Sequence, residues 1–312
     1  MKIALIVFAG LLVLPALLTS NTALSILVFA YILGIVAVSF NLIFGIAGQL
    51  SMFHAAAFGL GGYATYLSMA HWKISFWAGM ATGAVFVAVL ALIIGALCFR
   101  FKLKEFYFAI VTLAFAEILR LVVLNWNGLT NGSQGINFTL KPILSIPGLD
   151  PFTIHGTLPW YYLSLVFLAL AVAFYGMLVH SWLGRTFDAI RLNEDLAESL
   201  GVNIFRYKLA VFVLGSMGGA VGGSLYAFYI NFVEPNYLGV DQSLAILSMA
   251  LLGGKEFVAA PAVGAIVLTA LPHIIELNAE MRLLVYGVIL ILTILLLPRG
   301  VVGTLLSRRR VS

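Results

Sequence analysis

Apolar residues fill long, uninterrupted stretches of this chain, and polar residues are confined to short passages between them. From Ile3 to Trp72 the sequence contains no Asp, Glu, Lys or Arg. Because about 20 apolar residues in a helix already span the hydrocarbon core of a bilayer, a run this long predicts several consecutive spans rather than one core helix. The pattern lacks the alternating polarity, in segments of about ten residues, that is typical of transmembrane β-strands. We therefore expect an all-α fold, a polytopic transmembrane helical bundle.

Along the whole chain, the pattern predicts about ten spans separated by proline, glycine or charge. They cover residues 3–18, 22–44, 52–70, 77–98, 106–125, 159–180, 208–230, 241–256, 258–276 and 282–297. Some are short, so discontinuous helices are expected. The first could also be a cleaved signal peptide, but apolar sequence follows it directly, which favours an uncleaved helix. Residues 1–312 should form a single transmembrane domain.

Charge then orients the bundle. Only 9% of the residues are charged and the mean hydropathy is +1.10, so the net charge of +5 does not indicate a nucleic-acid partner. Basic residues of membrane proteins chiefly mark cytoplasmic loops. They gather at 100–104, 183–209 and 308–310, whereas the loop 126–158 has only Lys141. Ten passes with both termini in the cytoplasm place the three basic segments inside and loop 126–158 outside.

The most polar passage is "LGRTFDAIRLNEDLAESLGVNIFRYKL", residues 183–209, within the cytoplasmic loop 181–208. At helical spacing over 185–200, its apolar residues fall mainly on one side. These are Phe187, Ile190, Leu196, Ala197 and Leu200. Gly201 suits the left-handed end of a helix. We therefore predict a short amphipathic helix between two membrane spans.

The charges of this helix are of both signs. Arg191 lies three residues from Asp188 and Glu194 and four from Asp195, so ion pairs can support the polar face. An interfacial helix lying on the membrane is one interpretation. Such helices favour Lys and Arg on their polar face, however, and the modest apolar side here is better suited to a protein groove.

The passage "DAIRLNEDLAESLGVNIFRYKLAVF" resembles the cytoplasmic coupling loop of ABC importer permeases. The chain is similar to the branched-chain amino acid ABC transporter permease family, its LivM-like subunit, also in "NLIFGIAGQLSMFHAAAFGLGGYATYL", "YFAIVTLAFAEILRLVVLNWNGLTNGSQGI" and "SLAILSMALLGGKEFVAAPAVGAIVLTALP". The resemblance implies a single permease domain in the bacterial inner membrane. It also implies residues that couple the chain to an ATPase: Arg185, Asp188, Arg191, Glu194, Asp195, Ala197, Glu198 and Gly201.

The same resemblance implies partners: a second homologous permease subunit, cytoplasmic ATP-binding subunits, an external substrate-binding protein and membrane lipid. No G-x-x-x-x-G-K-[ST] phosphate loop occurs, and "LLGGKEF" lacks its spacing and hydroxyl residue. The chain is therefore expected to have no cofactor and no enzymatic activity of its own. ATP and Mg would be bound by the partner ATPases.

Polar residues within the spans are candidates for a translocation pathway. Glycines and polar side chains interrupt "FGIAGQLSMFHAAAFGLGGY", and broken helices tend to line substrate pathways. The candidates here are Asn41, Gln49, Ser51 and His54. Close packing through small residues is the alternative interpretation. A second interruption, at Gly253–Gly254, is expected near the cytoplasmic face.

Glu117 and Arg120 lie well inside a span, three residues apart, so they can meet on one helix face. Charges at bilayer depth are costly unless paired or hydrated, which marks them as candidate functional residues. One interpretation is a structural ion pair. The other is that the pair serves a zwitterionic amino acid in transit.

Other function classes fit the sequence less well. An ion-coupled secondary transporter would need Glu117 as its membrane carboxylate, and the charged passage would then have no role. A membrane enzyme lacks a metal-ligand cluster, because the five histidines are scattered and the single cysteine is Cys98. Branched-chain amino acids as the substrate rest on resemblance alone, and a permease of the same family for urea or another small polar solute fits the residues equally.

Overall fold

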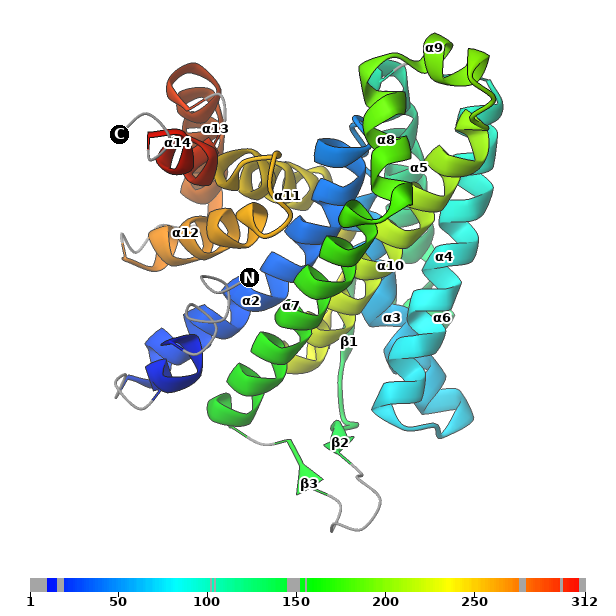
Figure 1. Ribbon diagram of the computed structural model, residues 1–312. Helices are drawn as coiled ribbons and strands as arrows, with labels where there is room; N and C mark the ends of the chain where they lie inside the picture. The colour runs from blue at the N-terminus through cyan, green and yellow to red at the C-terminus, as the bar shows by residue number, and fades with distance from the viewer. Residues whose placement is uncertain are drawn as a thin grey trace.

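The computed structural model describes residues 10–15, 20–101, 103, 105–144, 152–154, 156–274, 279–297 and 300–308. Most of the first predicted span, the choice between signal peptide and helix, and the basic residues at 102, 104, 309 and 310 lie outside these ranges. Within them the chain is a helical bundle (Figure 1).

The long helices of this bundle match the predicted spans. Five helices among the described residues are long and apolar enough to cross a membrane, at residues 21–46, 76–100, 106–125, 157–180 and 204–230. They correspond to α2 (Asn21–Asn41) with its π-helical continuation η1 (Leu42–Ile46), α4 (Phe76–Arg100), α5 (Glu105–Asn125), α7 (Thr157–His180) and α10 (Ile204–Ile230). The chain is therefore an integral membrane protein by length and composition.

Shorter helices complete the bundle. They are α3 (His54–Trp72), α11 (Val240–Gly253), α12 (Ala260–Ile274), α13 (Ala279–Leu296) and α14 (Gly300–Arg308). Each predicted span from 22–44 onward overlaps one helix, although α11 ends at Gly253, short of the predicted bound at 256. The expectation of about ten full crossings stays a prediction, because only five helices among the described residues are both long and apolar enough to cross a membrane.

Small residues bring α10 and α3 into backbone contact at the centre of the bundle. A β-carbon at Gly61 would collide with the carbonyl of Ala220, and one at Gly223 with the carbonyl of Phe58. A hydrogen bond between the hydroxyls of Thr65 and Ser224, 2.8 Å apart, closes the same contact. Close approach of this kind is what holds helices together where lipid offers no hydrophobic driving force.

The two polar connections lie at opposite ends of the bundle (Figure 1). At one end are α8 (Trp182–Leu192) and α9 (Glu194–Ser199). At the other, loop 126–158 contains α6 (Asn127–Thr130), the 3₁₀ turn η2 (Gly132–Gln134), and strands β1 (Ile136–Asn137), β2 (Ile143–Leu144) and β3 (Phe152–Thr153). β2 pairs with β3, and β1 with β4 (Phe232–Val233), all antiparallel. The opposite placement of these two connections is as the charge pattern predicts.

Between α10 and α11 the chain turns back into the bundle as an extended segment. It comprises β4 and the 3₁₀ turn η3 (Pro235–Leu238). Along it, Val233 approaches Gly62, Leu238 approaches Gly59, and the Ser243 hydroxyl donates to the Met52 carbonyl at 3.1 Å. The segment therefore runs antiparallel to α3 inside the protein, where irregular backbone is tolerated.

Candidate functional site

The charged passage forms two helices, where the sequence predicts one over 185–200. The break is at Asn193, whose backbone is extended and whose side-chain oxygen accepts from the Leu196 amide at 3.0 Å. Asparagine competes for the backbone through its own side chain, so it ends α8 and caps α9. The prediction of a continuous helix is therefore wrong at this residue.

α8 is packed firmly against the bundle. Its buried face consists of Gly184, Phe187 and Ile190. A β-carbon at Gly184 would collide with the carbonyl oxygen of Val179, in the last turn of α7. Phe187 also meets the ring of Tyr207 on α10, at 6.2 Å between centroids. α8 is consequently fixed to both α7 and α10.

α9 makes much weaker contacts. Ala197 is its only buried residue. A cavity of about 510 Å³ lies between α9, the turn at 201–205 and the end of α4. Close-packed interiors do not leave such space, so α9 is not part of the core.

The apolar side predicted for this passage is divided between two surfaces. Phe187, Ile190 and Ala197 are buried. Leu196 and Leu200 are instead 57% and 76% exposed, and Leu192 is 81% exposed. The prediction that all five apolar residues share one side of a helix is wrong for Leu196 and Leu200, because the helix breaks at Asn193. We refer to Leu192, Leu196 and Leu200 as the leucine row.

The predicted ion pairs are present only in part. Arg191 pairs with Asp188 at 3.2 Å, as its spacing predicts. Glu194 does not pair with Arg191 but with Lys208 of α10, at 2.5 Å, where the lysine side chain is only 6% exposed. The other donor group of Arg191, Nη1, reaches the carbonyl oxygen of Gly45 at 2.8 Å. Arg191 and Glu194 are therefore bound within the protein.

Gly201 ends α9 as the sequence predicts. Its φ is +87°, in the left-handed region that glycine adopts without strain. The amide of Gly201 donates to the Glu198 carbonyl, and the amide of Val202 to that of Ala197, both at 3.0 Å. These bonds satisfy carbonyls at the end of the helix.

The predicted interruption after α2 is also present. Residues 47–53 are non-helical and buried between α2 and α3. Their backbone is satisfied by polar side chains: the Met52 amide donates to the Thr112 hydroxyl of α5 at 3.1 Å, and the Phe53 amide to that of Ser51 at 3.2 Å. The backbone amide of Gln49 donates to the backbone carbonyl of Ile43. An irregular segment of this kind needs such partners because lipid supplies none.

The four candidate pathway residues around this segment are buried inside the chain. Asn41, Gln49, Ser51 and His54 are at most 2% exposed. The His54 ring meets Phe40 edge-on at 5.2 Å, beside the backbone of Gly215. Oδ1 of Asn41 and Oε1 of Gln49 have no hydrogen-bond partner among the described residues. Their burial fits helix packing, and a pathway role for them stays a prediction.

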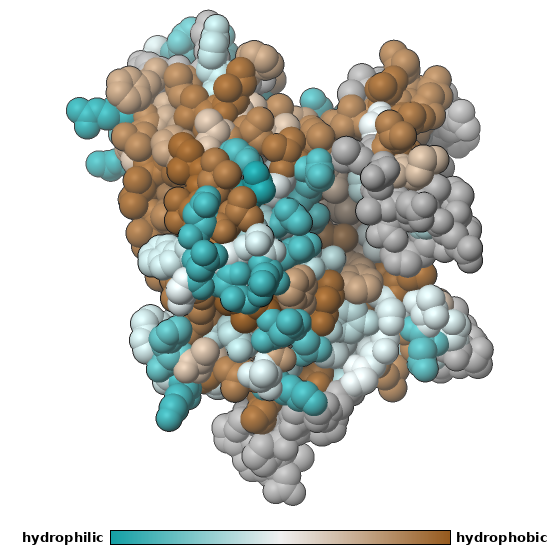
Figure 2. All heavy atoms as spheres, turned by 180° about the vertical axis from the view of Figure 1, so that it is seen from behind, coloured by the Kyte–Doolittle hydropathy of each residue, from teal (hydrophilic) through white to brown (hydrophobic). Residues whose placement is uncertain are grey.

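Glu117 and Arg120 meet on one face of α5, as their spacing predicts. Nε of Arg120 donates to both carboxylate oxygens of Glu117, at 2.9 and 3.0 Å. The side chains are 37% and 24% exposed, so the pair lies at the surface of this chain. Cδ of Arg120 is 3.9 Å from the β-carbon position of Gly239, at the start of α11. Figure 2 shows the face that is turned away from the viewer in Figure 1. On this face a band of hydrophilic residues lies between hydrophobic areas.

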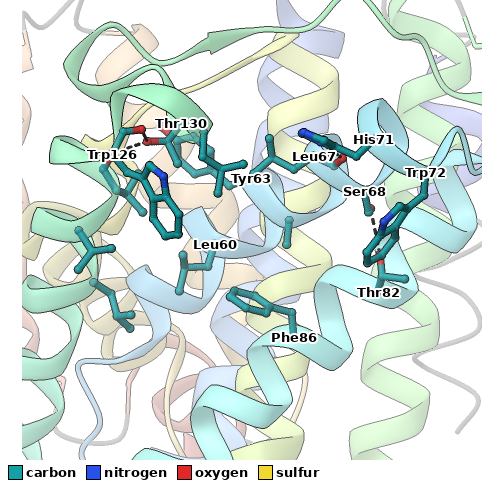
Figure 3. A pocket seen from close by; sticks show the side chains of 15 residues that line it. Leu60, Tyr63, Leu67, Ser68, His71, Trp72, Thr82, Phe86, Trp126 and Thr130 are labelled. Atoms are coloured by element: carbon teal, nitrogen blue, oxygen red, sulfur yellow. Dashed lines mark hydrogen bonds between the residues drawn. The ribbon is translucent and has the colours of Figure 1, made fainter.

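A separate pocket of about 480 Å³ lies between α3, α4, α5 and α6 (Figure 3). Its walls are mostly apolar, with Leu60, Phe86 and Val122 among them, and Trp72 and Trp126 lie at opposite sides of it. Among the described residues that line it, Tyr63 and His71 are the titratable ones. The pocket suits an apolar group, and it lacks charges that would bind both ends of a zwitterion.

A family model described as "Branched-chain amino acid transport system / permease component" matches residues 22–294, nearly the whole described bundle. The chain belongs to this family. No solved structure was found to match it.

Known relatives of this permease come from both bacteria and archaea. It is 26% identical over 317 residues to the high-affinity branched-chain amino acid transport system permease protein LivM of Escherichia coli (strain K12), covering 96% of this chain and 74% of the relative. It is 27% identical over 241 residues to the probable permease protein LivM of Methanocaldococcus jannaschii, covering 72% and 65%. It is 23% identical over 294 residues to the permease protein LivH of Escherichia coli (strain K12), covering 86% and 90%.

Three contacts of this permease were not foreseen from its sequence. They are the bond between Arg191 and Gly45, the pair of Glu194 and Lys208, and the return of residues 231–239 along α3. Each joins segments distant along the chain, so periodicity carried no signal for them. Only the Asn, Pro and Gly content of 231–239 indicated a break in helix there.

Proposed function

We propose that this permease is a membrane subunit of an ATP-binding-cassette importer. In this proposal, α8 and α9 are the helices that the ATPase contacts and displaces. The observation that carries this proposal is the leucine row, with exposed fractions of 81%, 57% and 76% within the polar connection. Exposed leucines in the aqueous phase indicate a surface that another protein covers. Leu192 ends α8 and Leu196 lies in α9, so the row crosses the break at Asn193 and presents apolar side chains from both helices.

The charges around the leucine row suit a protein partner. Arg185, Asp188 and Asp195 are exposed on the same two helices, with both signs represented. Arg191 and Glu194 bind within this chain and so fix the two helices. The partner is a cytoplasmic ATPase that holds ATP and Mg, and both termini of this chain lie on the same side of the bacterial inner membrane.

The opposite end of the bundle would receive substrate from an external binding protein. A groove of about 790 Å³ there is lined by Lys73 and Lys141, both exposed, together with Ser75 and Thr139. A basic groove favours an acidic partner through electrostatic steering. A second, related permease subunit would complete the pathway, in keeping with the similarity of this chain to both LivM and LivH.

The substrate proposed is a branched-chain amino acid, moved by alternating access as the ATPases approach and separate. Glu117 and Arg120 are partly exposed on a face that the second subunit would cover, and together they offer both charges to a zwitterion. A Glu117→Gln/Arg120→Gln double variant should lose most uptake in reconstituted vesicles. Unchanged uptake would assign the pair a structural role.

The importer proposal is tested by purifying the complex in mild detergent and measuring the co-purifying ATPase activity. Leu196→Asp should remove most of the associated ATPase, because a carboxylate in an apolar groove is costly. Leu196→Met, which keeps the apolar volume, should retain it. If the unaltered permease brings no ATPase with it, the proposal fails and an ion-coupled transporter becomes the better account.

A further inference from the structure

Three segments far apart along the chain meet at the π-helical end of α2. Arg191 of α8 donates to the carbonyl of Gly45 at 2.8 Å. On the other side of Gly45, Nδ2 of Asn41 is 3.4 Å from the carbonyl oxygens of both Lys255 and Phe257. The turn after α11 and the helix α8 are therefore both linked to η1 and the end of α2.

The fit around Arg191 is close. A β-carbon at Gly48, whose φ is +71°, would be 2.9 Å from Cγ of Arg191, so the arginine stem lies directly on the backbone. A β-carbon at Gly45 would collide with Oδ1 of Asn41 and stand 2.6 Å from the Lys255 carbonyl. Because neither glycine has a side chain, Arg191 can pack against Gly48, and the turn at Lys255 can pack against Gly45.

The chemistry of this contact also favours arginine. Gly45 lies in the last turn of a helix, where carbonyls lack an intrahelical donor and a cation is stabilising. Nη2 of Arg191 is held by Asp188 at 3.2 Å while Nη1 reaches Gly45. A planar guanidinium can keep both partners at once, whereas a lysine ammonium is a point charge on a flexible stem.

We propose that Arg191 is a positioning residue that transmits movement of α8 to the interrupted helix of the bundle. α8 is fixed to α7 and α10, so a displacement of α8 by a partner carries Arg191 with it and pulls on η1. From η1 the displacement reaches residues 47–53 and, through Asn41, the turn at 255–257. This inference rests on the proposed importer function, and it takes Arg191 out of the surface that contacts the ATPase.

The first test examines the contact without reference to transport. Hydrogen exchange of the peptide covering residues 42–49 is measured for Arg191→Ala and for Arg206→Ala, which removes an exposed arginine from the start of α10. Arg191→Ala should speed exchange in this peptide about tenfold, since the carbonyl cap is lost. Arg206→Ala should leave it unchanged, and Arg191→Lys should fall between. Equal exchange in the unaltered protein and in Arg191→Ala overturns the proposal.

The second test uses the reconstituted complex and measures substrate moved per ATP hydrolysed. Arg191→Ala should keep the ATPase bound at the unaltered amount, while uptake per ATP falls about tenfold, because hydrolysis continues without moving η1. Arg191→Lys should recover part of that ratio. An unchanged ratio, or loss of the ATPase itself, overturns the positioning role. If the unaltered permease binds no ATPase, the importer proposal fails, and the exchange result still decides the Arg191–Gly45 contact.

Discussion

α8 and α9 are neighbours within one polar connection, yet they are held in different ways. α8 buries three residues and places a glycine against the backbone of α7, whereas α9 buries only Ala197 and lies over a cavity of about 510 Å³. What fixes α9 is polar: the cap by Asn193 and the pair of Glu194 with Lys208. The difference supports the proposed division of roles, in which α8 transmits movement to the bundle and α9 contacts the partner.

The largest effect should come from filling the contact between α7 and α8. In Gly184→Ala the new methyl collides with the Val179 carbonyl, and backbone cannot move aside as a side chain would. We expect a loss of about 3 kcal/mol in the free energy of unfolding, measured as a lower thermal midpoint in detergent. Gly176→Ala in α7 is the matched control, since nothing lies within 4 Å of its β-carbon position. It should be neutral or stabilising by up to about 1 kcal/mol. Similar midpoints for the two variants would show that α8 is as loosely held as α9.

An intermediate effect is expected at the polar contact of α9, and it should be asymmetric. Glu194→Ala leaves the charge of Lys208 buried and unpaired, at a cost of about 2 kcal/mol in the local stability of α9. Lys208→Met removes that charge and leaves only Glu194, which is 46% exposed and can be hydrated, so the cost should be below about 1 kcal/mol. Hydrogen exchange over 194–202 measures both. A larger effect for Lys208→Met would contradict the view that the buried ammonium is what needs its partner.

The smallest effect should come from the cap between the helices. Asn193→Ala removes the acceptor for the Leu196 amide and should cost about 1 kcal/mol, seen as faster exchange at the start of α9 with α8 unchanged. Asn193→Ser keeps a capping oxygen and should preserve most of the protection. If exchange in α8 rises as well, the two helices behave as one unit and the comparison fails.

Much of the bundle was predictable because lipid imposes a simple rule on the sequence. Helices must satisfy their own backbone and show apolar residues outward, so the spans from 22–44 onward each correspond to a helix. The pairing of Glu117 with Arg120 and the left-handed Gly201 followed from spacing and residue type. The helical spacing failed as a guide at Asn193, where a side chain competes with the helix, and so Leu196 and Leu200 do not share the buried side of Phe187 and Ile190.

By itself, the sequence determined that the chain is a membrane bundle, where its helices lie, and which connection is polar, since those features depend on periodicity and charge along the chain. The tertiary structure decided what those residues contact. Arg191 bonds to Gly45 across 146 positions, Glu194 to Lys208, and residues 231–239 run back along α3. Contacts of this kind depend on which glycines let backbones approach and which carbonyls lack a donor, and both are settled only when the helices pack.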